Sequence, residues 1–484
     1  MQLECAQANM HRVTLAELDG NFSQMSLPMA TISIFRSLSE AEGAWREAAA
    51  HCACFVFQTF EWSWAWRESV GRTQDLADYI VHVADTDGRT LMLLPLAIRQ
   101  TGRLRVLEFL GGSLTDYNAP LIDRDFANTL TGETFERLWR QILGLLPEID
   151  LVWLVRMPQT IEGVPNPLIG LAGTRHTDEA HAATLPATFK ELTATRNTKF
   201  FAQIRRHRRR LEKLGTVEIC YPSEEEERLK VLHTLIEQKS RWVRSNGYPN
   251  PFGTHETRAF YERMTTSGLQ GGQMSVACLR VGDEIAAAVW GVIFGRRYYF
   301  LLTSYAEEWT NYSAGRILTE EVVRRCIDQK IEIFDLTRGD ESYKRYWSDH
   351  VLPLYEHLEA SSAKGLGFAM YRRLRSAVRS NRHLREWLAA SRRDGAPLEP
   401  AEALAAIPSA QPHRPISAKR AQWILAASQA VGIALARKAL LLFTHHWQSG
   451  LLALLFRLGA LRCCSRVTAS KNSGKSNAIQ LLFR

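Results

Sequence analysis

The chain of 484 residues alternates between two hydrophobic patterns from Ile32 onward. In one pattern the apolar residues are spaced three or four positions apart, which predicts helices. In the other the apolar residues are consecutive, or alternate with polar ones, over a few residues, which predicts strands. In the first half, helices are expected at residues 37–50, 57–71 and 132–147, and strands at 79–85, 89–100, 104–112 and 149–158.

The same alternation returns after residue 190. Helices are predicted at residues 193–215, 224–245, 254–269 and 316–330, and strands at 216–222, 296–306 and 331–339. Residues 273–295 are expected to form two further strands around a turn at Gly282-Asp283. Residues 171–188, which are rich in Ala, Thr and His, are expected to form a loop. The repeated order predicts an α/β (α+β) fold of two similar halves, each a mixed central sheet flanked by helices.

Charge separates a tail from this body. The net charge is +9, but residues 361–484 alone hold 20 Lys/Arg and 4 Asp/Glu. Such a basic segment favours anionic lipid or nucleic acid as a partner. We therefore divide the chain into an irregular N-terminus, two halves and a basic helical tail, at residues 1–30, 31–185, 186–358 and 359–484.

The tail combines a basic helix, expected at residues 371–393, with apolar runs at 421–436 and 439–456. A membrane span needs about 20 mostly apolar residues, and both runs are shorter. We therefore expect helices that lie on an anionic membrane surface. Because Glu4 and Arg12 interrupt any apolar run near the N-terminus, no signal peptide is expected, and we place the protein in the cytoplasm, peripheral to the membrane.

The eight cysteines include no C-x-x-C pair. The usual spacing of zinc ligands is therefore absent, and we expect free thiols and no metal.

Several polar residues gather where the strand at 331–339 ends. The segment "FDLTRGDESYKRYW" contains Asp335, Arg338, Tyr343 and Lys344. Acyl transfer from a thioester needs a deprotonated amine, a polarised carbonyl and a protonated leaving thiolate. Asp335 can orient or deprotonate an acceptor, Tyr343 can protonate the thiolate, and the two cations can hold an anionic group. Alternatively, Asp335 and Arg338 pair to shape the turn, and Tyr343 packs with Trp347.

A second motif, Ser313-Ala314-Gly315, opens the helix predicted at residues 316–330. Helix N-termini expose unpaired N–H groups and the positive end of the helix dipole, so they bind phosphate. Arg316 adds a positive charge there. The alternative is an ordinary helix start that Ser313 caps.

These motifs, in this order, resemble the GNAT acyltransferase core. More closely, they resemble the CelD/BcsL-type acetyltransferase family, which is related to FemAB-like aminoacyltransferases with tandem GNAT folds. The matching segments are "QK" with Trp242, "EIAAAVWG", "YSAGRIL" and "FDLTRGDESYKRYW", and in the first half "FQTFEWSWAW" and "LEFLGGSLTDYNAPLI". The resemblance covers roughly residues 35–355. The family prefers a proline where this chain has Ala314.

The resemblance implies an acyl-CoA-dependent N-acyltransferase without a metal, linked to cell-surface polysaccharide or envelope production. Its donor would be acetyl-CoA or another acyl-CoA, and its acceptor an amine of a small molecule or glycan precursor. Asp335 and Tyr343 would be catalytic. The substrate-binding residues would be Lys239, Arg338, Lys344 and Trp347, and the donor-binding residues Ser313, Gly315 and Arg316.

Other functions stay open. FemAB-like enzymes transfer an amino acid from aminoacyl-tRNA to a peptidoglycan precursor. The helix predicted at residues 193–215 is rich in basic residues, so it can bind phosphate or RNA. Alternatively, this helix is an ordinary solvent-exposed helix between the two halves. A non-catalytic GNAT scaffold at the membrane is the remaining alternative. In the first half, Asp116, Tyr117 and Asn118 follow a strand; they can line the acceptor side or form a turn with a packed tyrosine.

Overall fold

The fold is seen in a computed structural model that describes residues 30–339 and 341–380. The predicted apolar runs of the tail and the predicted N-terminal segment up to residue 29 lie outside the described residues. Within the described part, no helix is both long and apolar enough to cross a membrane.

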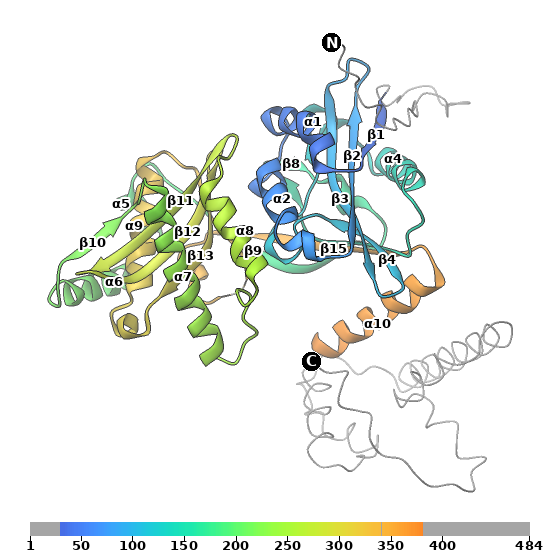
Figure 1. Cartoon of the computed structure of the whole chain (residues 1–484). Helices are drawn as coiled ribbons and strands as arrows, with labels where there is room; N and C mark the ends of the chain where they lie inside the picture. The colour runs from blue at the N-terminus through green and yellow to red at the C-terminus, as the bar shows by residue number, and fades with distance from the viewer. Residues whose placement is uncertain (1–29, 340, 381–484) are drawn as a thin grey trace, which may run out of the picture. The chain divides into compact units, whose positions relative to one another are not determined.

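The first half follows the order β–α–α–β–β–β–α–β (Figure 1). Its elements are β1 (Thr31–Phe35), α1 (Leu38–His51), α2 (Phe60–Arg67), β2 (Leu76–Ala84), β3 (Thr90–Thr101), β4 (Leu104–Phe109), α4 (Gly132–Leu145) and β6 (Leu151–Pro158). An insertion before α4 adds β5 (Leu121–Ile122) and α3 (Arg124–Thr129), and the hairpin of β7 (Thr160–Ile161) and β8 (Val164–Pro165) follows β6.

The second half repeats this order. Its elements are β10 (Val217–Cys220), α7 (Glu225–Ser245), α8 (His255–Thr266), β11 (Gly272–Val281), β12 (Glu284–Phe294), β13 (Arg297–Tyr305), α9 (Ala314–Asp328) and β14 (Ile333–Arg338). The basic helix predicted before it is divided into α5 (Phe189–Thr195) and α6 (Thr198–Leu211), because Asn197 caps the second helix with its side chain. The predicted fold class is confirmed.

Two strands cross between the halves. β9 (Arg175–Thr184) follows the first half in sequence but pairs with β14, and β15 (His350–Ala360) follows the second half but pairs with β6. Because β9 and β15 also pair, one 13-stranded sheet has the order β1-β2-β3-β4-β6-β15-β9-β14-β13-β12-β11-β10, with β5 beside β3. The prediction of a loop at 171–188 is wrong, because this segment contains β9. Each half is completed by a strand from the other.

Helices cover both faces of β11 and β12 (Figure 1). Alternate residues of these strands face α7 and α8 on one side and α6 and α9 on the other. On the α8 side the core continues into the first half, where the Trp62 ring centroid lies 5.1 Å from that of Phe260 and 6.4 Å from that of Trp290. Burying a large aromatic side chain contributes about 1.5–3 kcal/mol, so this contact stabilises the junction of the halves.

The first helix of the predicted tail packs on the sheet. α10 (Ala363–Ser380) follows β15, and the Ser362 hydroxyl donates to Oδ1 of Asp150 at 2.5 Å. The guanidinium of Arg372 lies 3.8 Å from the centre of the Trp153 ring. This part of the tail therefore belongs to the folded body.

A buried carboxylate joins the two halves. Asp335 of β14 is fully buried, and the Tyr117 hydroxyl of the first half donates to its Oδ1 at 2.7 Å. Nη1 of Arg297 donates to Oδ2 at 2.9 Å, and the Thr337 N–H donates to Oδ1 at 2.8 Å. Nε of Arg297 also donates to Glu162 of the first half, at 2.9 Å. A buried charge is costly unless it is paired and hydrogen-bonded, so these contacts hold the halves together. We call Asp335, Tyr117 and Arg297 the Asp335 clamp.

We expect Tyr117→Phe to lower the free energy of unfolding by about 1–3 kcal/mol, because a buried oxygen of Asp335 then loses a donor. Urea denaturation followed by circular dichroism measures this difference. Tyr371→Phe, at a residue that is 52% exposed, is the matched control and should stay within about 0.5 kcal/mol of the original protein. Equal stability of the Tyr117→Phe protein and the original would contradict the clamp.

The strand exchange makes a second prediction. We expect residues 30–185 and 186–380 to fold only when they are produced together. Alone, β6 lacks β15 and β14 lacks β9, which leaves open strand edges that aggregate. Size-exclusion chromatography and circular dichroism of the separate and coexpressed fragments test this. Two fragments that each purify as folded monomers would show that the exchanged strands are dispensable.

Candidate active site

The sheet opens between β13 and β14. These strands run parallel and pair only through Arg297–Tyr299 with Ile333–Asp335. Beyond that point β13 continues beside β12 to Tyr305, whereas β14 continues beside β9 to Arg338. The carboxyl ends of the two strands therefore diverge. In α/β sheets, ligands bind at the carboxyl ends of strands where neighbouring connections separate.

α9 starts beyond the carboxyl end of β13, after a 3-10 turn at Glu307–Tyr312. Ser313, the residue before α9, has a φ of 53°, and its side chain makes no capping hydrogen bond. Across the residues that the structure describes, no acceptor takes the N–H groups of Ala314 and Gly315. The alternative of a helix start that the Ser313 side chain caps is therefore not observed. The first turn of α9 presents unpaired donors and the positive end of its dipole.

Basic residues of α6 surround the start of α9. The guanidinium of Arg210 lies 5.2 Å from the centre of the Tyr312 ring, in the turn before α9. Burial and the positive charges of Arg210, Arg206 and Arg316 lower the pKa of His207, so His207 has these cations in its neighbourhood. The predicted basic helix thus concentrates positive charge where α9 begins.

The equivalent position in the first half is closed. β4 and β6 also run parallel and pair at only two positions, but the loop after β4 fills the space beyond. The Asn118 N–H donates to the carbonyl of Arg156 at 3.0 Å, and its side-chain amide donates to that of Val155 at 2.9 Å. α4 starts with a capping box, in which Thr131 and Thr134 accept each other's N–H groups. The first half therefore has its sheet opening filled and a side-chain cap with the acidic Glu133 at the start of α4, although no acceptor among the described residues takes the N–H groups of Gly132 and Glu133.

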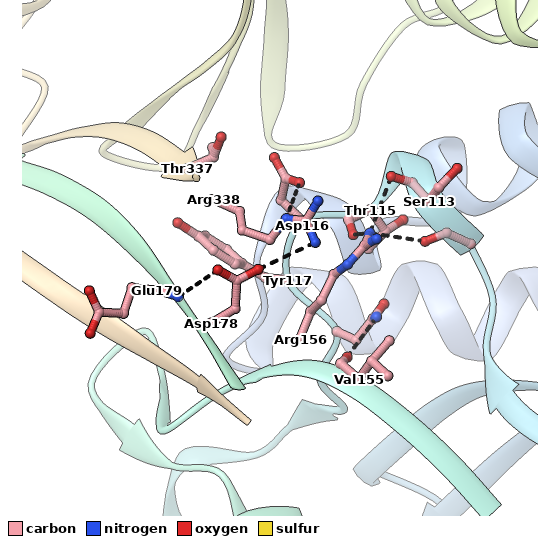
Figure 2. Close-up of polar contacts among 12 residues, drawn as sticks. Ser113, Thr115, Asp116, Tyr117, Val155, Arg156, Asp178, Glu179, Thr337 and Arg338 are labelled. Carbon is pink, nitrogen blue, oxygen red and sulfur yellow. Dashed lines mark hydrogen bonds and ion pairs between the residues drawn. The ribbon is translucent and has the colours of Figure 1, made fainter. Parts of the chain in front are cut away.

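Charged residues from both halves meet where β6 and β14 end (Figure 2). Arg338 lies between Asp116, in the loop after β4, and Asp178 of β9, with N–O distances of 3.9 and 3.4 Å. These ion pairs are longer than normal hydrogen bonds, so the guanidinium retains donors for a ligand. Nη1 of Arg156 donates to three carbonyls of the same loop, those of Gly112, Ser113 and Thr115. We call Arg338, Asp116, Asp178 and Arg156 the Arg338 cluster.

Strain and burial accompany the Arg338 cluster. Arg156 and Thr337 have φ angles of 57° and 56° and lie at register shifts on the equivalent strands β6 and β14. Such conformations cost about 1–3 kcal/mol for residues other than glycine and collect at functional sites. Burial raises the pKa of Asp116, although Arg338 acts in the other direction. Burial and the neighbouring Arg338 lower the pKa of Arg156 to about 10. The cluster therefore holds desolvated charges of both signs.

The two lysines predicted to bind substrate lie next to this cluster. Lys344 is buried, and its Nζ donates to the carbonyl of Arg338 at 2.6 Å and pairs with Glu341 at 2.9 Å. Nζ of Lys239 donates to the carbonyl of Thr303 at 3.3 Å, on the part of β13 that has no β14 neighbour. Burial lowers the pKa of Lys239. Lys344 thus fixes the turn after β14, whereas Lys239 faces the opening of the sheet.

The two aromatic residues of the predicted motif differ in environment. Tyr343 is half-buried, and burial together with Glu341 raises its pKa, so its phenol is protonated at neutral pH. Trp347 is buried against Phe200 and Phe201, with both centroid distances 5.4 Å. Its position is that of a core residue.

The structure brings Arg338, Lys344 and Lys239 together near the end of β14, with Asp335 buried in the clamp. The donor-site candidates Ser313, Gly315 and Arg316 lie at the start of α9. Arg156 and Asp178 were not among the residues predicted from the sequence. Asp178 was missed because its segment shows no strand pattern. In the described residues, no group of three or more His, Cys, Asp or Glu is arranged to hold a metal ion.

Comparison with known proteins supports a transferase. Residues 198–345 match the family model of the acetyltransferase (GNAT) domain. No curated protein matches the chain significantly. The solved structure of FemX is 10% identical, over 67% of this chain and 96% of its own, with a TM-score of 0.47.

Two other solved structures have lower TM-scores. The C-terminal domain of a putative lysylphosphatidylglycerol synthetase from Agrobacterium fabrum is 12% identical, over 69% of this chain and 95% of its own, with a TM-score of 0.41. A tandem GNAT protein from the clavulanic acid biosynthesis pathway is 10% identical, over 69% of this chain and 99% of its own, with a TM-score of 0.34.

The segment from α6 to the turn after β14 is thus an acetyltransferase (GNAT) domain, and the prediction of an acyltransferase enzyme is confirmed at this level.

Proposed function

We propose that this protein is an acyl-CoA-dependent N-acyltransferase whose second half binds the donor. The observation that carries the proposal is the contrast between two equivalent helix starts. α9 is uncapped and lies among arginines, whereas α4 is capped and its sheet opening is filled. A donor with phosphate groups needs unpaired N–H groups and positive charge, and in the described residues only the second of these halves offers both.

The donor thioester would lie between β13 and β14. With its phosphates at the start of α9, the donor arm can run along the part of β13 that has no β14 neighbour. Backbone groups there can bind the amides of the arm. The thioester would then point toward the carboxyl end of β14, next to the Arg338 cluster.

The acceptor amine would bind at the Arg338 cluster. The carboxylates of Asp116 and Asp178 attract an ammonium group, and Arg338 attracts an anionic group of the same acceptor. The amine nitrogen attacks the thioester carbon after losing a proton. Because burial raises its pKa, Asp116 is a better proton acceptor than an ordinary aspartate.

Tyr343 would complete the transfer. As the C–S bond breaks, the leaving thiolate takes a proton from the Tyr343 phenol, which is protonated at neutral pH before this step. The Tyr343 phenolate then takes the second proton from the nitrogen of the new amide, which restores the phenol. Both carboxylate oxygens of Asp335 already accept hydrogen bonds, one from Tyr117 and the other from Arg297. In this proposal, Asp335 therefore positions the end of β14.

The resemblance to the CelD/BcsL-type family favours an acceptor from cell-surface polysaccharide or envelope production, at an anionic membrane that the tail contacts. One observation favours a second candidate, transfer from aminoacyl-tRNA. Four arginines of α6 are exposed and form a basic surface that RNA can bind, namely Arg205, Arg206, Arg209 and Arg210.

We expect Gly315→Asp to weaken acetyl-CoA binding by about tenfold or more, because a carboxylate at the first turn of α9 repels phosphate. Isothermal titration calorimetry measures the affinity. Gly132→Asp places the same charge at the start of α4, where a Cβ meets nothing within 4 Å, and should leave the affinity unchanged. If neither variant changes acetyl-CoA binding, the donor site is not at α9. If the original protein binds aminoacyl-tRNA and no acyl-CoA, the second candidate replaces the first.

We expect Tyr343→Phe to lower kcat by about 100-fold and to change acetyl-CoA affinity little, because a proton donor acts in the transition state. Steady-state kinetics with a primary amine acceptor separate kcat from KM. Tyr248→Phe, at a residue that is 61% exposed, is the control. An unchanged kcat in Tyr343→Phe would leave this tyrosine a packing role.

A further inference from the structure

The side chain of Lys239 crosses from α7 to the open edge of β13. The N–H of Ala306, just beyond β13, donates to the carbonyl of the opposite residue on β12, Ala286, at 3.0 Å. Hydrogen bonding to a neighbouring antiparallel strand alternates from one residue to the next, and the register is regular along this part of the pair. The carbonyl of Thr303 therefore points away from β12, toward the opening, and Nζ of Lys239 donates to it at 3.3 Å.

The ammonium group of Lys239 is only partly satisfied there. An ammonium has three N–H donors, and among the described residues the Thr303 carbonyl is its one hydrogen-bond acceptor. The distance lies just beyond the usual range of about 2.7–3.2 Å. Nζ also lies 5.8 Å from the centre of the Trp242 ring, and the lysine side chain is half-buried. A ligand in the opening can therefore displace this weak contact.

The same environment favours the reactive form of Lys239. Burial lowers its pKa, the positive charge of Lys344 acts in the same direction, and Glu341 opposes both. A neutral amine is a nucleophile, whereas an ammonium group is not. Lys239 is therefore neutral, and able to attack a thioester, more often than an ordinary exposed lysine.

The proposed donor would bring its thioester to this lysine. The donor arm runs along the part of β13 that β14 leaves free, where an amide N–H of the arm needs a carbonyl such as that of Thr303. The arm thus takes the acceptor that Lys239 uses. Nζ then stays near the end of β14, because Lys344 and Glu341, which act on its pKa, lie in the turn after that strand. The thioester points toward the same strand end.

We propose that Lys239 is a self-acylation site, which takes the acyl group from the bound donor when no acceptor is present. This inference rests on the proposed acyl-CoA donor. The neutral Nζ attacks the thioester carbon, an N–C bond forms and the C–S bond breaks. The leaving thiolate takes a proton from the Tyr343 phenol, and one of the two Nζ protons restores that phenol. The other Nζ proton stays on the new amide, so the products are acyl-Lys239 and CoA.

Self-acylation would switch the site off. An amide is far less reactive than a thioester, so the acyl group remains on Lys239. The modification removes a positive charge from the opening and fills space that the donor needs. An acceptor, when present, competes with Lys239 for the same thioester. The activity of the site would therefore depend on the supply of acceptor.

The test uses the full chain with acetyl-CoA and no acceptor, followed by peptide mass spectrometry. Trypsin does not cleave after an acetylated lysine, so acetyl-Lys239 appears in a peptide that spans residues 231–241. Lys230, on the same helix and with a side chain that is 62% exposed, measures chemical acetylation in solution. We expect Lys239 to be acetylated at least about tenfold faster than Lys230, because binding holds its amine and the thioester together.

Three variants check the route of the acyl group. Gly315→Asp should weaken acetyl-CoA binding and slow acetylation of Lys239 by about tenfold or more, whereas Gly132→Asp should change neither. Lys239→Arg keeps the charge without an acylatable amine and should lose the fast acetylation. Lys230 should be acetylated at the same rate in all three variants as in the original protein.

Equal rates at Lys239 and Lys230 would overturn the inference. So would an unchanged rate at Lys239 in a Gly315→Asp protein that no longer binds acetyl-CoA. An unmodified Lys239 in a protein that binds acetyl-CoA by calorimetry overturns the inference and leaves the proposed function intact. Failure of the original protein to bind acetyl-CoA overturns both.

Discussion

The desolvated charge of Asp335 is the constraint on which the arrangement of the two halves depends. Its carboxylate has no access to water, so its donors must come from the protein, and one of them, Tyr117, belongs to the first half. The same short stretch of chain carries Asp116 into the Arg338 cluster. The interaction that stabilises the junction therefore also brings the first half's charge to the second half's strand ends. Disturbing the clamp would move the proposed acceptor site as well.

The two halves share their architecture but differ in chemistry. Both have parallel strands that diverge, and both have a residue with positive φ near the strand end, Arg156 in one and Thr337 in the other. The first half fills its opening with its own loop, and that loop also forms a wall of the site that we propose in the second half. With one half open and the other closed, the proposed site can contain residues from both halves. One half alone could not provide all of these residues.

Much of the fold could be predicted from the sequence, because apolar spacing decides which segments form helices and buried strands. β9 could not, since its first residues, Arg175 to Glu179, are polar and largely exposed. The polar motif at the end of β14 was recognisable, and Arg338 and Lys344 do lie there. The environment of Asp335 was not, because its partner Tyr117 is 218 positions away in the chain. Burial from distant contacts leaves no local pattern.

The exchange of β9 and β15 also has a consequence during synthesis. The first half has been synthesised at about residue 185. Its strand β6, however, cannot pair with β15 until the chain has been synthesised to Ala360, where β15 ends. At about 5–20 residues per second, translation of the intervening chain takes roughly 10–40 s. During that time β6 has an unpaired edge of backbone N–H and C=O groups. We therefore expect the nascent chain to need shielding by the ribosome or a chaperone until the last strand emerges, and slow translation between the halves to favour misassembly.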